Sequence, residues 1–141
     1  MQVTFYYESA IRIRQIRRLQ SFIANLFLKE GRQLKQLRYI FCSDEYLLQI
    51  NRQFLNHDYY TDIISFNLSE NARSPIEGEI YISTERVKEN AAIHQTPFQQ
   101  ELHRVIFHGA LHLCGYKDKT KQQQIAMRAR EDHYLSAYSL L

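Results

Sequence analysis

Apolar side chains recur at strand-like and helix-like intervals in the first half of the chain and predict its first elements. Residues 2–7 alternate loosely between aromatic and β-branched types, which is typical of a short strand. From Ile13 onward, apolar residues recur every three or four positions, which predicts an amphipathic helix of about 17 residues that Gly31 closes. Residues 37–42 predict a second strand, and Ser43 is placed to cap a short helix after it.

The middle of the chain predicts two more strands. Residues 61–66 have a polar entry followed by apolar residues, and we interpret them as a central strand. Residues 79–82 alternate cleanly, and the longest linker, residues 68–77, joins these two strands. Ser83 or Thr84 is expected to cap the helix that follows.

Two further helices are predicted in the last third of the chain. Thr96 as N-cap, Pro97 in the first turn and Gln99 as the glutamine of a capping box indicate the start of one helix. Thr120 with Gln123 repeats the capping-box pattern and indicates the start of a terminal helix. This order of elements predicts an α+β fold, a small mixed sheet of about four strands covered by helices, in one domain over residues 1–141.

Composition excludes several classes of protein. The chain has 45% hydrophobic and 23% charged residues, which is typical of a folded globular protein and not of a disordered one. No apolar run is long enough to span a bilayer, and the first residues lack the pattern of a signal peptide. Its only cysteines, Cys42 and Cys114, are expected to be reduced thiols. We therefore expect a cytoplasmic protein without a membrane partner.

Positive charge is concentrated at the start of the chain. Residues 1–40 contain eight Lys and Arg against two Glu, a net charge of +6 there in a chain of net charge +3. A basic half of this kind suits a polyanion such as a nucleic acid, although a solvated basic helix face gives the same pattern.

Two histidines four residues apart are the strongest chemical signal. His108 and His112 fall on the same side of the helix predicted after Pro97, bordering its apolar face. Gly115 suits a left-handed residue just past the helix end, so the chain can turn back and bring Asp118 to the histidines. Two imidazoles and a carboxylate are a ligand set for zinc that leaves one position open. In the alternative, the histidines are polar edge groups and Asp118 caps the last helix.

The residue after the first histidine argues against a protease. Zinc proteases of the His-Glu-x-x-His type place a glutamate there as the general base, whereas this chain has Gly109. Glu101 is about 10 Å up the helix axis from His108, and we expect it at the surface or behind the ligands. Cys114 points away from the histidines and is expected in the core.

These residues resemble the signature of a known family, the YbeY-type rRNA maturation factors, which are small bacterial metal-dependent endoribonucleases. The family motif of a helix with two histidines and a turn glycine is matched by His108, Gly109, Leu111, His112, Leu113, Gly115 and Tyr116. Residues 61–66 and 78–80 are similar to two further family blocks, and with the lead-in from Asn51 to Phe54 the resemblance covers about half of the chain.

The resemblance implies a zinc-binding α+β domain with a zincin-like metal helix. It implies that His108 and His112 are zinc ligands, and it aligns Asp118 with a third family ligand that is a histidine. An aspartate can bind zinc, but its extra negative charge reduces the Lewis acidity of the metal. We therefore expect one zinc ion per chain, bound by His108, His112 and Asp118. We also expect slower hydrolysis than at a site whose third ligand is a histidine.

The resemblance also implies a residue that this chain lacks. The family has an arginine, which engages the RNA phosphate, at the position of Leu55. Arg52, Lys117 and Lys119 are the candidate substitutes, since the two lysines flank Asp118. Residues 51–60 are expected to form a polar, aromatic loop in which Tyr59 or Tyr60 stacks on a base.

The function that follows is a zinc-dependent endoribonuclease specific for single-stranded RNA. The resemblance implies a role in 16S rRNA 3′-end maturation and late ribosome quality control, with rRNA and the small ribosomal subunit as partners and no nucleotide cofactor. Two alternatives stay open: a non-catalytic ribosome-assembly factor stabilised by the metal, and a zinc hydrolase acting on peptides.

Overall fold

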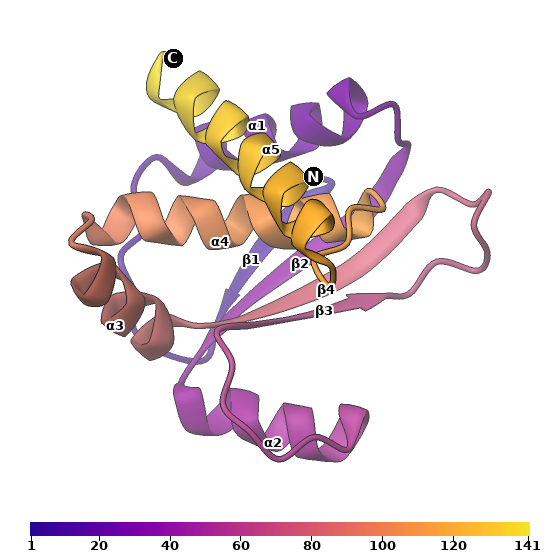
Figure 1. The fold of residues 1–141 in the computed structure, drawn as a ribbon. Coiled ribbons are helices and arrows are strands. Elements are labelled where there is room, and N and C mark those ends of the chain that lie inside the picture. Colours follow the sequence, from indigo (N-terminus) through magenta and orange to yellow (C-terminus); the bar gives the residue numbers. More distant parts are fainter.

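The computed structural model describes residues 1–141 as a four-stranded sheet with five helices (Figure 1). The strands are β1 (Val3–Tyr7), β2 (Leu34–Cys42), β3 (Ile63–Asn67) and β4 (Ile76–Ser83), and the helices are α1 (Ile16–Lys29), α2 (Asp44–Leu55), α3 (Thr84–His94), α4 (Phe98–Leu113) and α5 (Lys121–Ser139). The strand order is β1-β2-β4-β3, with β3 antiparallel to β4 and the other pairs parallel. The expected α+β fold with a small mixed sheet is confirmed.

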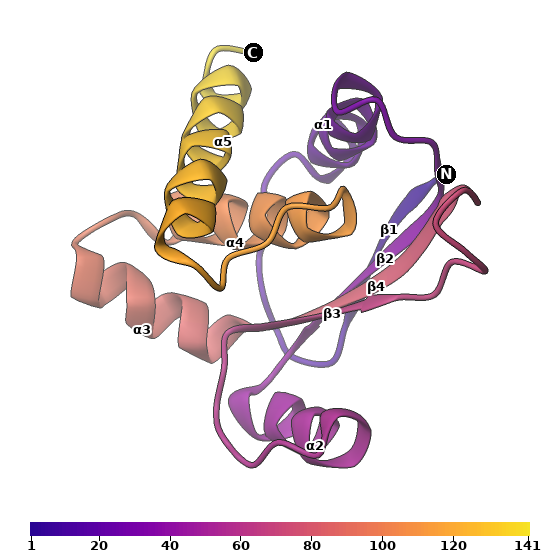
Figure 2. The same ribbon diagram turned by 45° about the vertical axis from the view of Figure 1, so that its right-hand side comes forward.

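Helices lie on both faces of the sheet, but most of them gather on one. α1 and α4 cover one face with α5 lying across α4, α2 lies against the other face, and α3 flanks the end of the sheet (Figures 1 and 2). The main core lies under α1, α4 and α5 and includes the fully buried Leu19, Ile23, Phe27, Leu37, Tyr39, Ile80, Ile106, Phe107 and Tyr134. Every helix is too short or too polar to cross a membrane.

The strand expected at the centre of the sheet is at its edge. β3 pairs only with β4, and β2 and β4 are the central strands. β3 follows β2 in sequence but pairs with β4 instead, so the strand order and not the local pattern of residues places it at the edge. β2 and β4 also start earlier than expected, at Leu34 and Ile76, so the linker between β3 and β4 is shorter.

Two helix boundaries differ from the prediction in the first half of the chain. α1 begins at Ile16 and not at Ile13, because Gln15 has a left-handed backbone with φ of 52°. α2 continues to Leu55, through the first half of the expected loop at 51–60, and ends where Asn56 is left-handed. The expected cap of α2 is confirmed, since the Ser43 hydroxyl accepts a hydrogen bond from the Tyr46 amide.

The caps of the later helices are partly as expected. Ser83 caps α3, and Thr120 with Gln123 forms the complete capping box of α5. The capping box expected for α4 is wrong: Pro97 is the N-cap residue, and the Thr96 hydroxyl is buried without a partner. The Gln99 amide instead donates to the Arg12 carbonyl oxygen, a tertiary contact that removes it from the capping role.

A close approach between α4 and the sheet depends on one glycine. A Cβ atom added at Gly109 would lie 2.9 Å from the Cδ1 atoms of Ile63 and Ile80. Gly109 therefore packs directly against β3 and β4, and it holds the two histidines of α4 close to these strands.

Candidate metal centre

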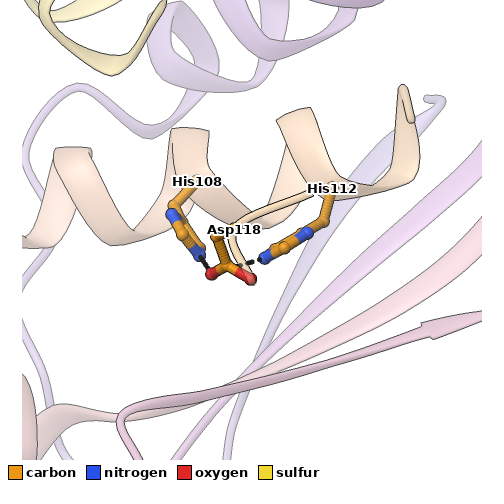
Figure 3. Close-up of side chains that lie close together, drawn as sticks. All are labelled: His108, His112 and Asp118. Carbon is orange, nitrogen blue, oxygen red and sulfur yellow. Dashed lines mark hydrogen bonds and ion pairs between the residues drawn. The ribbon is translucent and has the colours of Figure 1, made fainter. Parts of the chain in front are cut away.

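The two histidines of the motif lie side by side on α4. His108 and His112 are one turn apart, and their ring centroids are 4.5 Å from each other with an interplanar angle of 86°. Both side chains are about one-quarter exposed, at 21% and 28%. Their Nε2 atoms point to the same space beside the edge of the sheet (Figure 3).

The turn after α4 brings the carboxylate to both imidazoles. Gly115 has φ of 113°, and the Tyr116 amide donates to the Leu111 carbonyl oxygen across the helix end, which is the backbone pattern of a glycine-terminated helix. Asp118 Oδ2 then lies 3.3 Å from His108 Nε2 and 3.2 Å from His112 Nε2 (Figure 3). All ligand atoms of these three residues lie within 4.8 Å of one another.

The second ring nitrogen of His108, Nδ1, contacts a buried ion pair between Glu131 and Arg104. His108 Nδ1 lies 2.6 Å from Glu131 Oε2, and Arg104 donates to the other oxygen at 2.9 Å. Burial alone would raise the pKa of the Glu131 carboxyl, but hydrogen bonds from His108 and Arg104 outweigh it and lower that pKa. An ionised Glu131 favours the proton on Nδ1, and the Nε2 lone pair is then free for a metal.

His112 is held by the backbone of the same turn that carries Asp118. Its Nδ1 lies 2.9 Å from the Tyr116 carbonyl oxygen. The Tyr116 hydroxyl in turn donates to Glu30 at 2.8 Å, and Arg32 donates to the Cys114 carbonyl oxygen. Residues just after α1 therefore clamp the turn from which His112 and Asp118 take their positions.

This donor set fits a divalent transition metal. Two imidazole nitrogens face one carboxylate oxygen, and each imidazole is oriented through its second nitrogen, as is usual for metal-binding histidines. Cys114 is buried, and burial raises the pKa of its thiol to about 12, so it is not a competing thiolate. Glu101 is buried and not at the surface: it lies beside His94, two helical turns before His108, and contacts none of the three residues of the candidate site.

A cleft of about 480 Å³ opens beside the metal centre. It is lined by Asn51, Leu55, His57, Tyr59, Thr61, Asp62, Ile63, Ile64, Ser65, Asn67, His108, His112, Leu113 and Asp118, and therefore by the end of α2, the loop after it, and the outer edge of β3. The buried Asn51 side chain donates to the Tyr59 carbonyl oxygen and holds this loop in place. The lining contains no lysine or arginine.

The residues considered for RNA contacts are not equally placed. Arg52 is paired with Asp58, and Lys117 and Lys119 are exposed on either side of Asp118. Tyr59 lines the cleft, whereas Tyr60 lies under the Arg86 guanidinium, 5.3 Å from its ring centroid. Tyr59 is thus the aromatic side chain that is available to a base in the cleft.

Comparison with known proteins gives this site its context. The family model described as Endoribonuclease YbeY matches residues 4–139 of the chain. The chain belongs to the YbeY family. A YbeY relative named Endoribonuclease YbeY, from Cytophaga hutchinsonii, is 50% identical over 94% of this chain and 92% of its own length. Another of that name, from Flavobacterium psychrophilum, is 45% identical over 96% of each chain.

The fold of this YbeY chain also matches a solved structure. The solution structure of TM1509 from Thermotoga maritima has a TM-score of 0.69 and 26% sequence identity, and the match covers 96% of this chain and 88% of that one. The resemblance noted from the histidine motif is therefore confirmed over nearly the whole chain.

Sequence reasoning missed the groups that orient the ligands. Glu131 is on α5, and it continues a buried stripe formed by Met127, Tyr134 and Tyr138. An acid on an apolar stripe is the signal that could have revealed a buried ionic partner. Glu30 and the Tyr116 carbonyl gave no such signal, because they act through contacts between distant segments.

We expect Glu30→Gln to weaken metal binding about tenfold, although Glu30 touches no ligand. The change removes the charge that accepts hydrogen bonds from Tyr116, Arg130 and Tyr134, and it loosens the turn before Asp118. Zinc affinity is measured by competition with a chelator dye, with the exposed Glu70→Gln as the control. An unchanged zinc affinity in Glu30→Gln would show that the clamp does not position the ligands.

Proposed function

We propose that this chain is a zinc-dependent endoribonuclease that cleaves single-stranded RNA. The observation that carries the proposal is the convergence of His108, His112 and Asp118 in an open cleft, in a chain of the YbeY family. Its relatives that bear the name Endoribonuclease YbeY support the reaction class. Zinc is proposed because two imidazoles and one carboxylate are borderline ligands that make no redox demand.

Each residue near the cleft has a proposed task. When bound, zinc supplies Lewis-acid polarisation of a phosphate oxygen and of water. His108, His112 and Asp118 hold the ion, while Glu131 and the Tyr116 carbonyl keep the two imidazole rings oriented. Tyr59 stacks on a base of the strand, and Lys117 and Lys119 attract the phosphates that leave the cleft, with Arg52 more remote.

The proposed substrate in the cell is rRNA. Following the family resemblance, we place the chain in 16S rRNA 3′-end maturation and late ribosome quality control in the cytoplasm. The small ribosomal subunit is the proposed partner, and residues 1–141 are proposed to act as one domain.

The test is an RNA cleavage assay with control of the metal. We expect purified protein to contain close to one zinc ion per chain and to cut a single-stranded RNA but not the same sequence in a duplex. Cleavage should stop when the zinc is removed by a chelator and return when zinc is restored. Cleavage that persists in metal-free protein would contradict the proposal, and cleavage of casein in place of RNA would favour the peptide hydrolase.

One observation favours a second function, that of a non-catalytic assembly factor. The cleft contains no lysine or arginine to stabilise phosphoryl charge, and Leu55 lines it where the family has an arginine. In that case the metal ties the turn before α5 to α4, and RNA is bound without being cut. The peptide hydrolase is disfavoured, because Gly109 provides no general base and has no room for one.

We expect Leu55→Arg to raise kcat/KM for RNA by about 10- to 100-fold. Leu55 is 38% exposed at the cleft, so a guanidinium there can reach the phosphate. One preorganised donor contributes about 100- to 1,000-fold to a rate, and a newly added side chain should give less. The control is Ile93→Arg, which adds the same charge on the exposed side of α3. An equal rise in both variants would mean that general attraction of RNA, and not the cleft, limits the reaction.

A further inference from the structure

A second concave site lies on the side of α4 away from the cleft. It is a cavity of about 940 Å³ between the segment before α1, the first half of α4 and the end of α5. Arg12, Arg14, Arg18 and His103 line it, together with uncharged residues, and no aspartate or glutamate side chain does. We call it the arginine cavity. It shares no residue with the cleft beside the metal centre.

None of the three arginines that line the cavity is paired with a carboxylate side chain. Arg12 and Arg14 are exposed and take no part in an ion pair. Five other arginines are each paired with a carboxylate: Arg38, Arg52, Arg86, Arg104 and Arg130. Part of the unbalanced positive charge of the basic N-terminal segment therefore lies at this cavity.

The walls of the cavity are fixed, although these two guanidinium groups are free. Arg18 donates to the main-chain oxygens of Tyr138 and Leu141, and its guanidinium carbon lies 4.8 Å from the Tyr138 ring centroid. The Gln99 amide donates to the Arg12 carbonyl oxygen at 3.0 Å, which ties the segment before α1 to α4. A ligand would thus meet preorganised backbone and pay less ordering entropy.

Two polar atoms of the cavity residues have no partner. Gln99 Oε1 and His103 Nε2 are buried and form no hydrogen bond. Burial, and to a lesser degree Arg18, lowers the pKa of His103 to about 4, so its imidazole is neutral at neutral pH. Both atoms lie behind the cavity surface, so the groups that a ligand in the cavity can reach first are the exposed guanidinium groups of Arg12 and Arg14.

The cleft offers few positive charges to a polyanion. No lysine or arginine lines it, so beyond the metal and the flanking Lys117 and Lys119 a longer strand needs basic groups elsewhere on the molecule. We propose that the arginine cavity binds phosphates of single-stranded RNA outside the segment that enters the cleft. This inference rests on the proposed RNA substrate. Guanidinium groups bind phosphates and carboxylates alike in bidentate pairs, so the proposed RNA substrate, and not the geometry of the fork, favours RNA over an acidic peptide here.

The test compares RNA of two lengths with two double variants. Binding is measured in the presence of a chelator, so that the RNA is not cut during the measurement. Two single-stranded RNAs are used, one of about 30 nucleotides and one of about 6 nucleotides. We expect Arg12→Gln with Arg14→Gln to bind the long RNA about five- to tenfold more weakly at low salt. The slope of log affinity against log salt should fall by about 1.4 in magnitude, since two phosphate contacts are lost.

The matched control removes the same charge elsewhere. Arg73→Gln with Arg128→Gln changes two exposed arginines that line neither the cavity nor the cleft and form no ion pair. It should keep both the affinity and the salt slope of the unmodified protein. An equal loss in both double variants, or competition by a polyglutamate peptide at the same concentration as RNA, would overturn the inference.

The outcome for the short RNA separates this inference from the proposed function. Cleavage of the 6-nucleotide RNA should be equal in the Arg12, Arg14 variant and the unmodified protein, because that RNA occupies only the cleft. If the unmodified protein binds long RNA through Arg12 and Arg14 but cuts neither RNA, the proposed function fails and the inference stands. If it cuts both RNAs and the variant binds and cuts them equally well, the inference fails and the proposed function stands.

Discussion

His112→Ala is expected to lower RNA cleavage by more than about 100-fold. Groups that only orient a metal ligand already contribute about 10- to 100-fold, and His112 is proposed to bind the ion directly. The change also leaves the Tyr116 carbonyl oxygen without its imidazole partner and removes one of the two imidazoles beside Asp118. The measurement is the initial rate on a single-stranded RNA, together with the zinc content of each protein preparation.

The control for this loss is another histidine of the same chain. His133 is exposed on α5 and forms no hydrogen bond, so His133→Ala removes an imidazole without touching the metal centre. It should keep its zinc and its rate. Equal residual cleavage by the His112→Ala protein and the unmodified protein would point to a contaminating nuclease, and it would favour the non-catalytic assembly factor.

The metal centre was predictable to the extent that it is local. The interval between His108 and His112 and the place of Gly115 act through bonded geometry within one helix and one turn, so spacing alone brings Asp118 close. The orienting groups depend on how α5 crosses α4. Glu131 follows His108 by 23 residues, and only the packed structure shows that their side chains meet.

The fold was predictable in its elements and less so in its arrangement. Alternation and caps predicted the four strands and five helices, because these signals come from neighbouring residues. The edge position of β3 depends on strand order, which has no local signal. The extension of α2 to Leu55 depends on the left-handed Asn56 and on the buried Asn51 amide, and it moves Leu55 from a loop to the rim of the cleft.

That arrangement also explains why the motif has a glycine where zinc proteases have a glutamate. Position 109 faces the sheet, and even a Cβ atom there would lie 2.9 Å from Ile63 Cδ1 and 2.9 Å from Ile80 Cδ1. His108 and His112 lie on either side of this contact, and their side chains line the cleft at the edge of the sheet. A general base at this position would be buried under α4 and could not reach a substrate.

We therefore expect Gly109→Glu to unfold the protein and not to create a protease. The new side chain would overpack the contact between α4 and β4, which costs about 1–3 kcal/mol, and it would bury an unpaired carboxylate, which costs several kcal/mol more. The free energy of unfolding should fall by at least about 3 kcal/mol, seen as a lower urea midpoint. Gln100→Glu adds the same charge on an exposed position of the first turn of α4, where the helix dipole tolerates it, and should leave the midpoint unchanged. A stable Gly109→Glu protein that cuts casein would contradict this expectation. It would mean that α4 can move away from the sheet, and that only the missing glutamate separates this site from those of the zinc proteases.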